Sequence, residues 1–276
     1  MHDSAYLAPE GRRLDSVNAG ARLRRPRLPP VVPSHVPSPF PPMNTFGLAF
    51  AEALRMVFHG DSTLATIVLL SLRVSAASIA IATLVAMPLG ALLAVASFRG
   101  QRPVIVTLNA LLGLPSVVVG LAVYLLLSRA GPLGSLGILF TPAAMVVAQA
   151  VLVTPLIAAL TRQLVSDAWV ETNEQLRSLG AGPLASALAL LFDLRYSLVT
   201  VVLAGFGRAV SEVGAVMIVG GNIDGVTRVM TTAIALETSK GDLPLALGLG
   251  LVLLAIVLAI NVVAHLIREA VQRRHG

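Results

Sequence analysis

The stretch Thr63–Phe98 reads TLATIVLLSLRVSAASIAIATLVAMPLGALLAVASF and contains one charged residue, Arg73. A helix rises about 1.5 Å per residue and needs about 20 mostly apolar residues to cross the hydrocarbon of a bilayer. The stretch is longer than one crossing, so we expect part of it to tilt or to extend beyond the hydrocarbon. Small residues recur every four positions and predict a face for close helix packing, as small residues do in lipid: Ser78, Ala82, Ala86, Gly90 and Ala94.

Further segments of the chain have the same character. They are Val104–Ser128, Ile138–Thr161, Ser197–Gly220 and Leu243–Leu266. Only Ser197–Gly220 contains charged residues, and these are Arg208 and Glu212. We therefore predict an all-α polytopic membrane protein with five transmembrane helices.

Composition supports this class. Of 276 residues, 56% are hydrophobic and only 12% are charged, whereas a soluble domain is about 25% charged. The absence of cysteine excludes thiol catalysis, iron–sulfur clusters and cysteine zinc sites. The net charge of +6 indicates arginine-rich cytoplasmic loops and membrane lipid contact rather than nucleic acid as a partner.

Residues 1–42 differ from the remainder, because they hold nine of the 17 prolines and show neither helical nor strand periodicity. Two interpretations compete: a disordered Pro/Arg-rich tail, or a translation start assigned too early, with Met43 as the first residue. We favour the second, because the apolar periodic pattern begins at Met43.

Residues 43–62 predict an amphipathic lead-in segment. Phe46, Phe50, Leu54 and Phe58 recur at helical spacing, with Glu52 and Arg55 on the other side. Such a pattern suits a helix at the membrane interface. The alternative is an ordinary beginning of the first transmembrane helix.

Short loops fix the expected orientation, since cytoplasmic loops are enriched in Lys and Arg. One side of the predicted topology carries Arg129, Arg228 and Lys240. We therefore expect an inner-membrane protein whose 163–195 loop and C-terminus are cytoplasmic and whose N-terminus is outside. The positive residues on the cytoplasmic side are Arg99, Arg102, Arg162, Arg177, Arg195, Arg268, Arg273 and Arg274.

The loop at about 163–195 is long and patterned. Residues 171–179 suit a short surface helix, Gly180-Ala-Gly182-Pro183 ends it, and Ala185–Phe192 is apolar again. Glycine permits the left-handed conformation that ends helices, and proline suits the first turn of the next helix. We predict a helix–turn–helix that docks on a soluble partner. The alternative is a solvated connector.

Within this loop, Glu174–Gly180 (EQLRSLG) resembles the EAA loop of ABC-transporter permeases, in which a Glu precedes a Gly by six residues. Gln175 and Leu176 replace the two alanines of that motif. The resemblance implies a coupling helix that sits in a groove of the ATP-binding subunit. It assigns this coupling role to Glu171, Glu174, Arg177, Leu179 and Gly180.

A second resemblance covers about Leu64 to Leu266. Gly205–Ile223 (GFGRAVSEVGAVMIVGGNI) resembles the oxyanion-importing permeases of the molybdate and tungstate group, and Thr227–Asp242 (TRVMTTAIALETSKGD) resembles the tungstate branch. This implies a type I importer with two permease copies, two ATP-binding subunits and an extracytoplasmic substrate-binding protein. The substrate implied is tungstate, with molybdate or another small anion as the alternative.

Charged residues suggest two further sites. Arg208 and Glu212 are four residues apart and face the same way on a helix, so we expect either a gate or interface pair that breaks during transport or a static pair. Asn222, Arg228 and Lys240 lie in the predicted external loop and form a candidate funnel for anions. The alternative for these external residues is partner contact or simple solvation.

The chain lacks the Gly-Lys-Ser/Thr of a phosphate-binding loop, because its one lysine, Lys240, lies between Ser239 and Gly241. We therefore expect no enzyme activity and no cofactor in this chain, with ATP bound by a partner subunit. His59, His265 and His275 lack metal-site spacing. The alternative function, from a different class of protein, is a stand-alone channel or secondary carrier. A carrier would need ionisable groups within its membrane spans, and this chain has few there.

Overall fold

The computed structural model describes residues 44–275, with side chains for residues 47–270. The predictions for residues 1–42 and for Met43 lie outside the described residues. Every regular element within 44–275 is helical, as predicted. The elements are α1 Asn44–His59, α2 Ser62–Val95, α3 Gln101–Leu111, α4 Ser116–Leu127, the 3-10 turn η1 Gly134–Leu136, α5 Pro142–Ser178, α6 Pro183–Asp193, α7 Arg195–Val210, α8 Gly214–Gly220, α9 Met230–Lys240 and α10 Leu243–His275.

Long apolar helices make the chain a multi-pass membrane protein. Among the described residues, three helices (α2, α5 and α10) are each long and apolar enough to cross a membrane. Two bent pairs pass the same test together, α3 with α4 at 103° and α6 with α7 at 81°. The described residues therefore provide three crossings, or up to five if each bent pair counts as one.

Two of the predicted spans are not single helices. The Val104–Ser128 segment is interrupted at residues 112–115, where Pro115 lies immediately before α4. Proline has no N–H to donate and disfavours helical conformation in the residue before it, so the helix stops there. The Ser197–Gly220 segment is interrupted at residues 211–213, and α8 is a separate helix of seven residues.

Helix α5 corrects the prediction for the long loop. It continues for 37 residues through Pro155 to Ser178. The residues expected to form a separate surface helix are therefore the last turns of a membrane helix. The second half of the prediction is confirmed, since α6 begins at Pro183.

The predicted small-residue face of α2 packs against α5. Ser78, Ala82 and Ala86 are fully buried, and Ala94 is partly exposed. A Cβ added at Gly90 would lie 2.5 Å from the carbonyl oxygen of Ala158. Only glycine therefore permits this approach of the two backbones.

Helix α1 is separate from α2, so the alternative that residues 43–62 begin the first transmembrane helix is wrong. Gly60 adopts φ +68° between the two helices. Ala49 and Ala53 are buried on a helix that contacts α10. Phe58 is 83% exposed, and Glu52 pairs with Arg55 at 4.0 Å.

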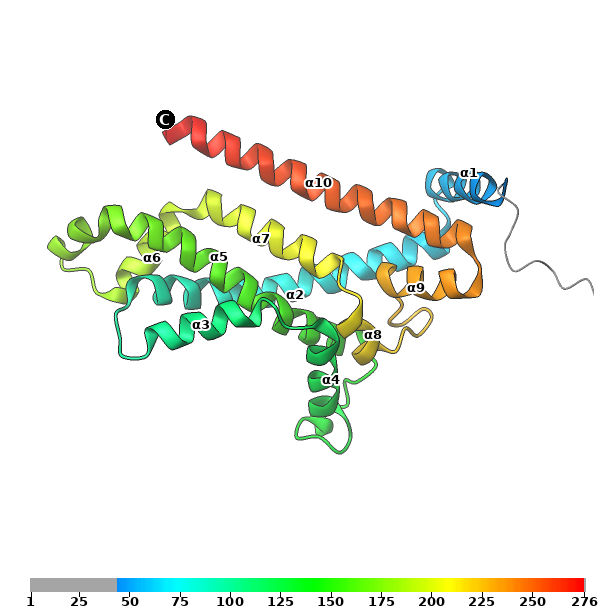
Figure 1. The fold of residues 1–276 in the computed structure, drawn as a ribbon, viewed down its shortest axis with the longest axis horizontal. Coiled ribbons are helices and arrows are strands. Elements are labelled where there is room, and N and C mark those ends of the chain that lie inside the picture. The colour runs from blue at the N-terminus through cyan, green and yellow to red at the C-terminus, as the bar shows by residue number, and fades with distance from the viewer. Residues whose placement is uncertain (1–43, 276) are drawn as a thin grey trace, which may run out of the picture. The chain divides into compact units, whose positions relative to one another are not determined.

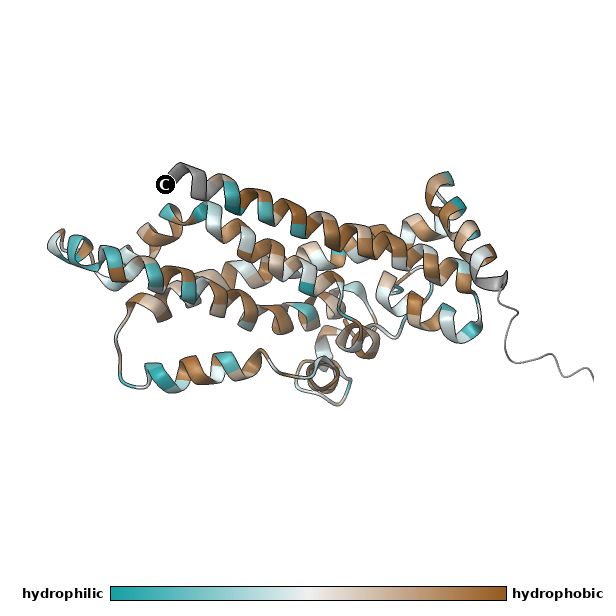
Figure 2. Ribbon diagram, turned by 45° about the horizontal axis from the view of Figure 1, so that its top comes forward, coloured by the Kyte–Doolittle hydropathy of each residue, from teal (hydrophilic) through white to brown (hydrophobic). Residues whose placement is uncertain are grey.

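Within residues 44–275, Figure 1 shows the end of α5, helix α6 and the C-terminal end of α10 toward one end, with α1 and α9 toward the opposite end. Apolar residues extend along most of α10 (Figure 2), and Leu254 and Leu258 of this helix are exposed. Exposed leucines of this kind suit contact with lipid.

Candidate functional site

The break between α7 and α8 lies beside the start of α4, the helix that follows the break after α3. Glu212 lies in the break between α7 and α8, and its carboxylate is close to the hydroxyl of Ser116, the first residue of α4. Helices α4 and α8 then pack so closely that a Cβ at Gly120 would lie 2.6 Å from the Cα of Ala215. A movement of α8 at the break between α7 and α8 would therefore also move α4, which begins after the break between α3 and α4.

Arg208 and Glu212 form the ion pair that their spacing predicts. Arg208 Nη1 donates to Glu212 Oε2 at 2.6 Å. The Ala215 N–H donates to the other carboxylate oxygen, Oε1, at 3.2 Å. The Glu212 side chain is 3% exposed and the Arg208 side chain is 44% exposed. The carboxylate is thus the buried member, and several donors compensate for its lost hydration.

Side chains from three other helices hold the backbone around this break. The Thr231 hydroxyl donates to the Glu212 carbonyl at 2.7 Å. Gln149 Nε2 donates to the Ala209 carbonyl at 3.0 Å, and its Oε1 accepts from the Ser78 hydroxyl at 3.0 Å. Buried backbone groups need such partners. Sequence reasoning missed Ser116, Gln149 and Thr231, because no local pattern marks residues so distant along the chain.

The predicted external residues lie around helix α9. Arg228 Nη1 is 3.1 Å from Asp224 Oδ1 and 3.8 Å from Glu237 Oε1, and Lys240 Nζ is 3.0 Å from the same Glu237 oxygen. Asn222, at φ +51°, donates from Nδ2 to the Thr232 carbonyl at 3.4 Å. The two basic residues therefore share one carboxylate. The anion funnel stays a prediction.

The predicted coupling residues lie at the end of α5. The Gly180 N–H donates to the Arg177 carbonyl at 2.9 Å, and the Ala181 N–H donates to the Leu176 carbonyl at 3.0 Å. This pair of bonds, with Gly180 at φ +73°, is the Schellman arrangement that ends helices. Polar residues gather on this end of α5 (Figure 2). Glu171, Glu174, Arg177 and Leu179 are all exposed.

Helix α6 adds an apolar surface that sequence reasoning did not single out. Its inner face, Ala187 and Leu190, packs in a core cluster with Ala91, Val95 and Val165. Its outer face leaves large apolar side chains uncovered at every fourth position, a spacing that could have revealed it. These are Leu184, Leu188 and Phe192, at 61%, 55% and 71% exposure, and they follow Leu179 at 81%.

No group of three or more His, Asp or Glu residues is placed to hold a metal ion within residues 44–275. The fold and its interrupted, polar-lined helices define a multi-pass α-helical membrane protein. No family model matches the chain. Curated proteins, however, match it over most of its length.

The chain is 46% identical over 220 residues to the tungstate uptake system permease protein TupB of Peptoclostridium acidaminophilum, covering 80% of this chain and 96% of that protein. It is 37% identical over 220 residues to TupB of Campylobacter jejuni, covering 80% and 92%. A probable anion ABC transporter permease protein of Haloferax volcanii is 38% identical over 218 residues, covering 77% and 94%. The chain belongs to this family of ABC-transporter permeases.

Proposed function

We propose that the chain is the translocation subunit of an ATP-driven importer for tungstate. The observation that carries this proposal is the 46% identity to a tungstate uptake permease across 96% of that protein. A second tungstate uptake permease matches over a similar length. The relative described only as an anion permease leaves molybdate as the alternative substrate.

The assembly that we propose contains two copies of this chain, two ATP-binding subunits and an extracytoplasmic substrate-binding protein. ATP binds to the partner subunits, since this chain has no Gly-Lys-Ser/Thr sequence. Its own role is to provide the path across the membrane and to couple that path to ATP hydrolysis.

Coupling occurs, in this proposal, through the end of α5 and the outer face of α6. An exposed polar helix end with Glu171 and Glu174 lies next to the uncovered apolar row of α6. The turn at Gly180 fixes the angle between the two helices through main-chain hydrogen bonds. Such a rigid corner suits transmission of force from a docked ATP-binding subunit.

The orientation of the chain in the membrane follows from assigning the end of α5 and α6 to the docking surface for the ATP-binding subunit. The end of α5, α6 and the C-terminal end of α10 lie toward the same end (Figure 1). The arginines of the predicted cytoplasmic side belong to α5 and α10, to the start of α7, to the connection between α2 and α3 and to the start of α3. We place this end in the cytoplasm, because positively charged residues favour the cytoplasmic side. The N-terminal end of α2 is then on the external side.

The Arg208–Glu212 pair is our proposed gate. Its carboxylate member, Glu212, lies in the break between α7 and α8, close to Ser116 at the start of α4. Discontinuous helices of this kind provide hinges and polar groups in many transporters. Breaking and re-forming this pair would move α8 relative to α4.

The test is the ATPase activity of the reconstituted complex in lipid nanodiscs. Addition of tungstate-loaded binding protein should stimulate ATP hydrolysis severalfold, and unloaded binding protein should stimulate it much less. A complex that responds to the molybdate-loaded protein alone would make molybdate the substrate. A complex without any response to either loaded protein would refute the proposed function.

A further inference from the structure

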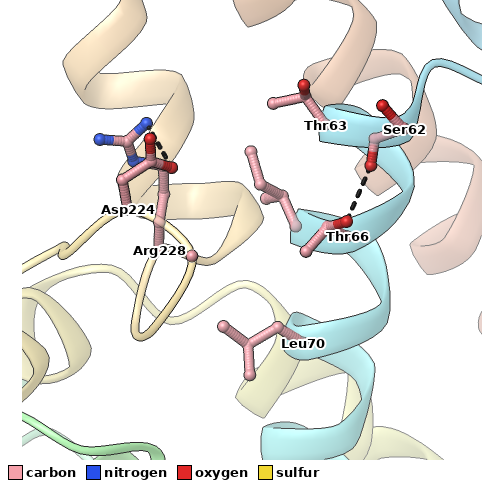
Figure 3. Close-up of a pocket in the computed structure, with 8 residues that line it drawn as sticks. Ser62, Thr63, Thr66, Leu70, Asp224 and Arg228 are labelled. Atoms are coloured by element: carbon pink, nitrogen blue, oxygen red, sulfur yellow. Dashed lines mark hydrogen bonds and ion pairs between the residues drawn. The ribbon is translucent and has the colours of Figure 1, made fainter.

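A cavity of about 360 Å³ lies between the first turns of α2 and the loop that joins α8 to α9. Figure 3 shows Ser62, Thr63 and Thr66 on the α2 side, with Asp224 and Arg228 on the loop side. Leu70 lines the cavity from deeper along α2. The cavity is therefore polar at its mouth and apolar farther along the membrane helix.

Hydroxyl groups provide hydrogen-bond donors on the α2 side. The Thr66 hydroxyl donates to the Ser62 carbonyl at 2.8 Å. Ser62 and Thr63 are exposed, so their hydroxyls can turn toward an anion in the cavity. A hydroxyl donates one hydrogen bond and carries no charge. These donors suit the oxygen atoms of an oxyanion without binding it tightly.

Arg228 provides the charge on the loop side. Its side chain is 15% exposed, and two carboxylates approach it through Nη1. Its Nε is buried and has no hydrogen-bond partner within the described residues. A guanidinium holds its donors in a planar fork that fits oxyanions in bidentate fashion. Arg228 thus lines a cavity whose opposite wall carries the hydroxyl groups of α2.

We propose that this cavity is a low-affinity transit site for a tetrahedral oxyanion with two negative charges. The inference rests on the proposed function and adds a location to it. An arriving anion competes with Asp224, whose side chain is 75% exposed and free to move away, for the guanidinium of Arg228. Glu237, 6% exposed, stays between Arg228 and Lys240.

Charge balance explains why the site is weak. Asp224 and Glu237 together neutralise Arg228 and Lys240, so the anion meets no net positive charge. The α2 N-terminus adds little, because Asp61 already accepts from the N–H groups of Thr63 and Leu64 at 2.9 and 3.0 Å. Weak binding is appropriate in a conduction path, where the ion must leave again.

Cysteine protection tests the inference, because the chain has no native cysteine. Leu70→Cys places one thiol in the cavity of the full chain in lipid nanodiscs, and a small methanethiosulfonate reagent labels it. Tungstate should slow labelling in a concentration-dependent manner, and the protection should be weak because a transit site must release its ion. Ser239→Cys, on exposed α9 outside the cavity, should be labelled at a rate that tungstate does not change.

Two further substitutions in the Leu70→Cys protein test whether Arg228 and Asp224 control the protection by tungstate. Arg228→Gln should abolish protection, whereas Arg129→Gln, which removes an exposed charge elsewhere, should preserve it. Asp224→Asn removes the competing carboxylate, so protection should require about threefold less tungstate, an effect within the range of one exposed ion pair. Equal protection in the Arg228→Gln and parent proteins would overturn the inference, as would weaker protection in Asp224→Asn.

Comparing thiol protection with tungstate import distinguishes failure of the transit site from failure of the proposed function. A complex that imports tungstate while Leu70→Cys shows no protection refutes the transit site alone. Protection by sulfate or molybdate but not by tungstate would retain an oxyanion site and refute tungstate as the substrate. If the Leu70→Cys thiol resists labelling altogether, Thr63→Cys provides the same readout from the mouth of the cavity.

Discussion

The guanidinium of Arg208 lies 2.6 Å from the carboxylate of Glu212, yet the two side chains differ sharply in exposure, at 44% and 3%. Glu212 also accepts a hydrogen bond from the Ala215 N–H and lies close to the hydroxyl of Ser116. The carboxylate is therefore the centre of the site, and Arg208 is one of its three partners. A symmetric ion pair would tolerate exchange of its members, but this arrangement should not.

Exchange of the two charges should therefore impair transport strongly. In the Arg208→Glu/Glu212→Arg variant, the guanidinium at position 212 can only donate hydrogen bonds, so the Ala215 N–H loses its acceptor. Leaving a buried group unsatisfied costs about 1–3 kcal/mol, and uptake should fall at least about tenfold. Uptake by vesicles containing equal amounts of inserted protein measures this effect.

The single variants provide the comparison. Arg208→Gln retains the buried carboxylate with its Ser116 and Ala215 contacts, so it should be less harmful than Glu212→Gln. Normal transport by the exchanged double variant would mean that pairing alone matters, and the central position assigned to Glu212 would be wrong.

Gly180→Val should uncouple transport from ATP hydrolysis without preventing membrane insertion. Gly180 adopts φ +73°, where a side chain is strained although the space around it is open. The left-handed conformation costs about 1–2 kcal/mol per non-glycine residue, and a β-branched residue is especially unsuited to it. Stimulation of the partner ATPase by loaded binding protein should drop severalfold.

Gly182→Ser is the matched control for this turn. Gly182 lies at φ −73° with open space around its Cα, and serine is a favourable residue before a helix. This variant should retain stimulated ATPase activity. If Gly180→Val couples as well as Gly182→Ser, the turn is not part of the coupling surface.

Leu188→Ser should weaken docking of the ATP-binding subunit. Leu188 is 55% exposed in the middle of the uncovered row of α6, so its loss changes the surface more than the fold. Exposed substitutions usually alter stability by less than about 0.5 kcal/mol. Co-purification of the ATP-binding subunit should decrease, while Leu48→Ser, a similar change at a 71% exposed position of α1, should leave it unchanged. Unaltered docking in Leu188→Ser would remove α6 from the proposed interface.

Gly90→Ala should destabilise the permease itself. The new Cβ would lie 2.5 Å from the Ala158 carbonyl oxygen, so α2 and α5 must separate, and overpacking of this kind costs about 1–3 kcal/mol. Thermal unfolding in detergent should occur several degrees lower. Gly250→Ala in α10, where nothing lies within 4 Å of the added Cβ, should be neutral or slightly stabilising. Equal unfolding temperatures for the two variants would contradict the packing described for α2 and α5.

Much of the architecture could be predicted from the sequence, because lipid imposes simple rules on helix length and composition. The long apolar segments, the packing face of α2 and the pairing of Arg208 with Glu212 all follow from local spacing. The continuity of α5 beyond the apolar segment did not follow, since residues 162–178 are polar enough to read as a loop.

The interruptions were harder to predict. Pro155 lies within an unbroken α5, whereas Pro115 lies in the break where α3 and α4 bend by 103°, so proline alone does not determine where a helix breaks. The partners of the break, Ser116, Gln149 and Thr231, are brought to it by tertiary packing. The neutralisation of Arg228 by Asp224 and Glu237 likewise depends on how the external loop folds.

The most direct test of the central claim is tungstate uptake into proteoliposomes that contain this chain with its ATP-binding subunit. Uptake should require both ATP inside the vesicles and binding protein outside, and it should stop when either is omitted. The chain alone should transport no tungstate. Uptake by the chain without ATP or binding protein would indicate a channel or secondary carrier and would contradict the account.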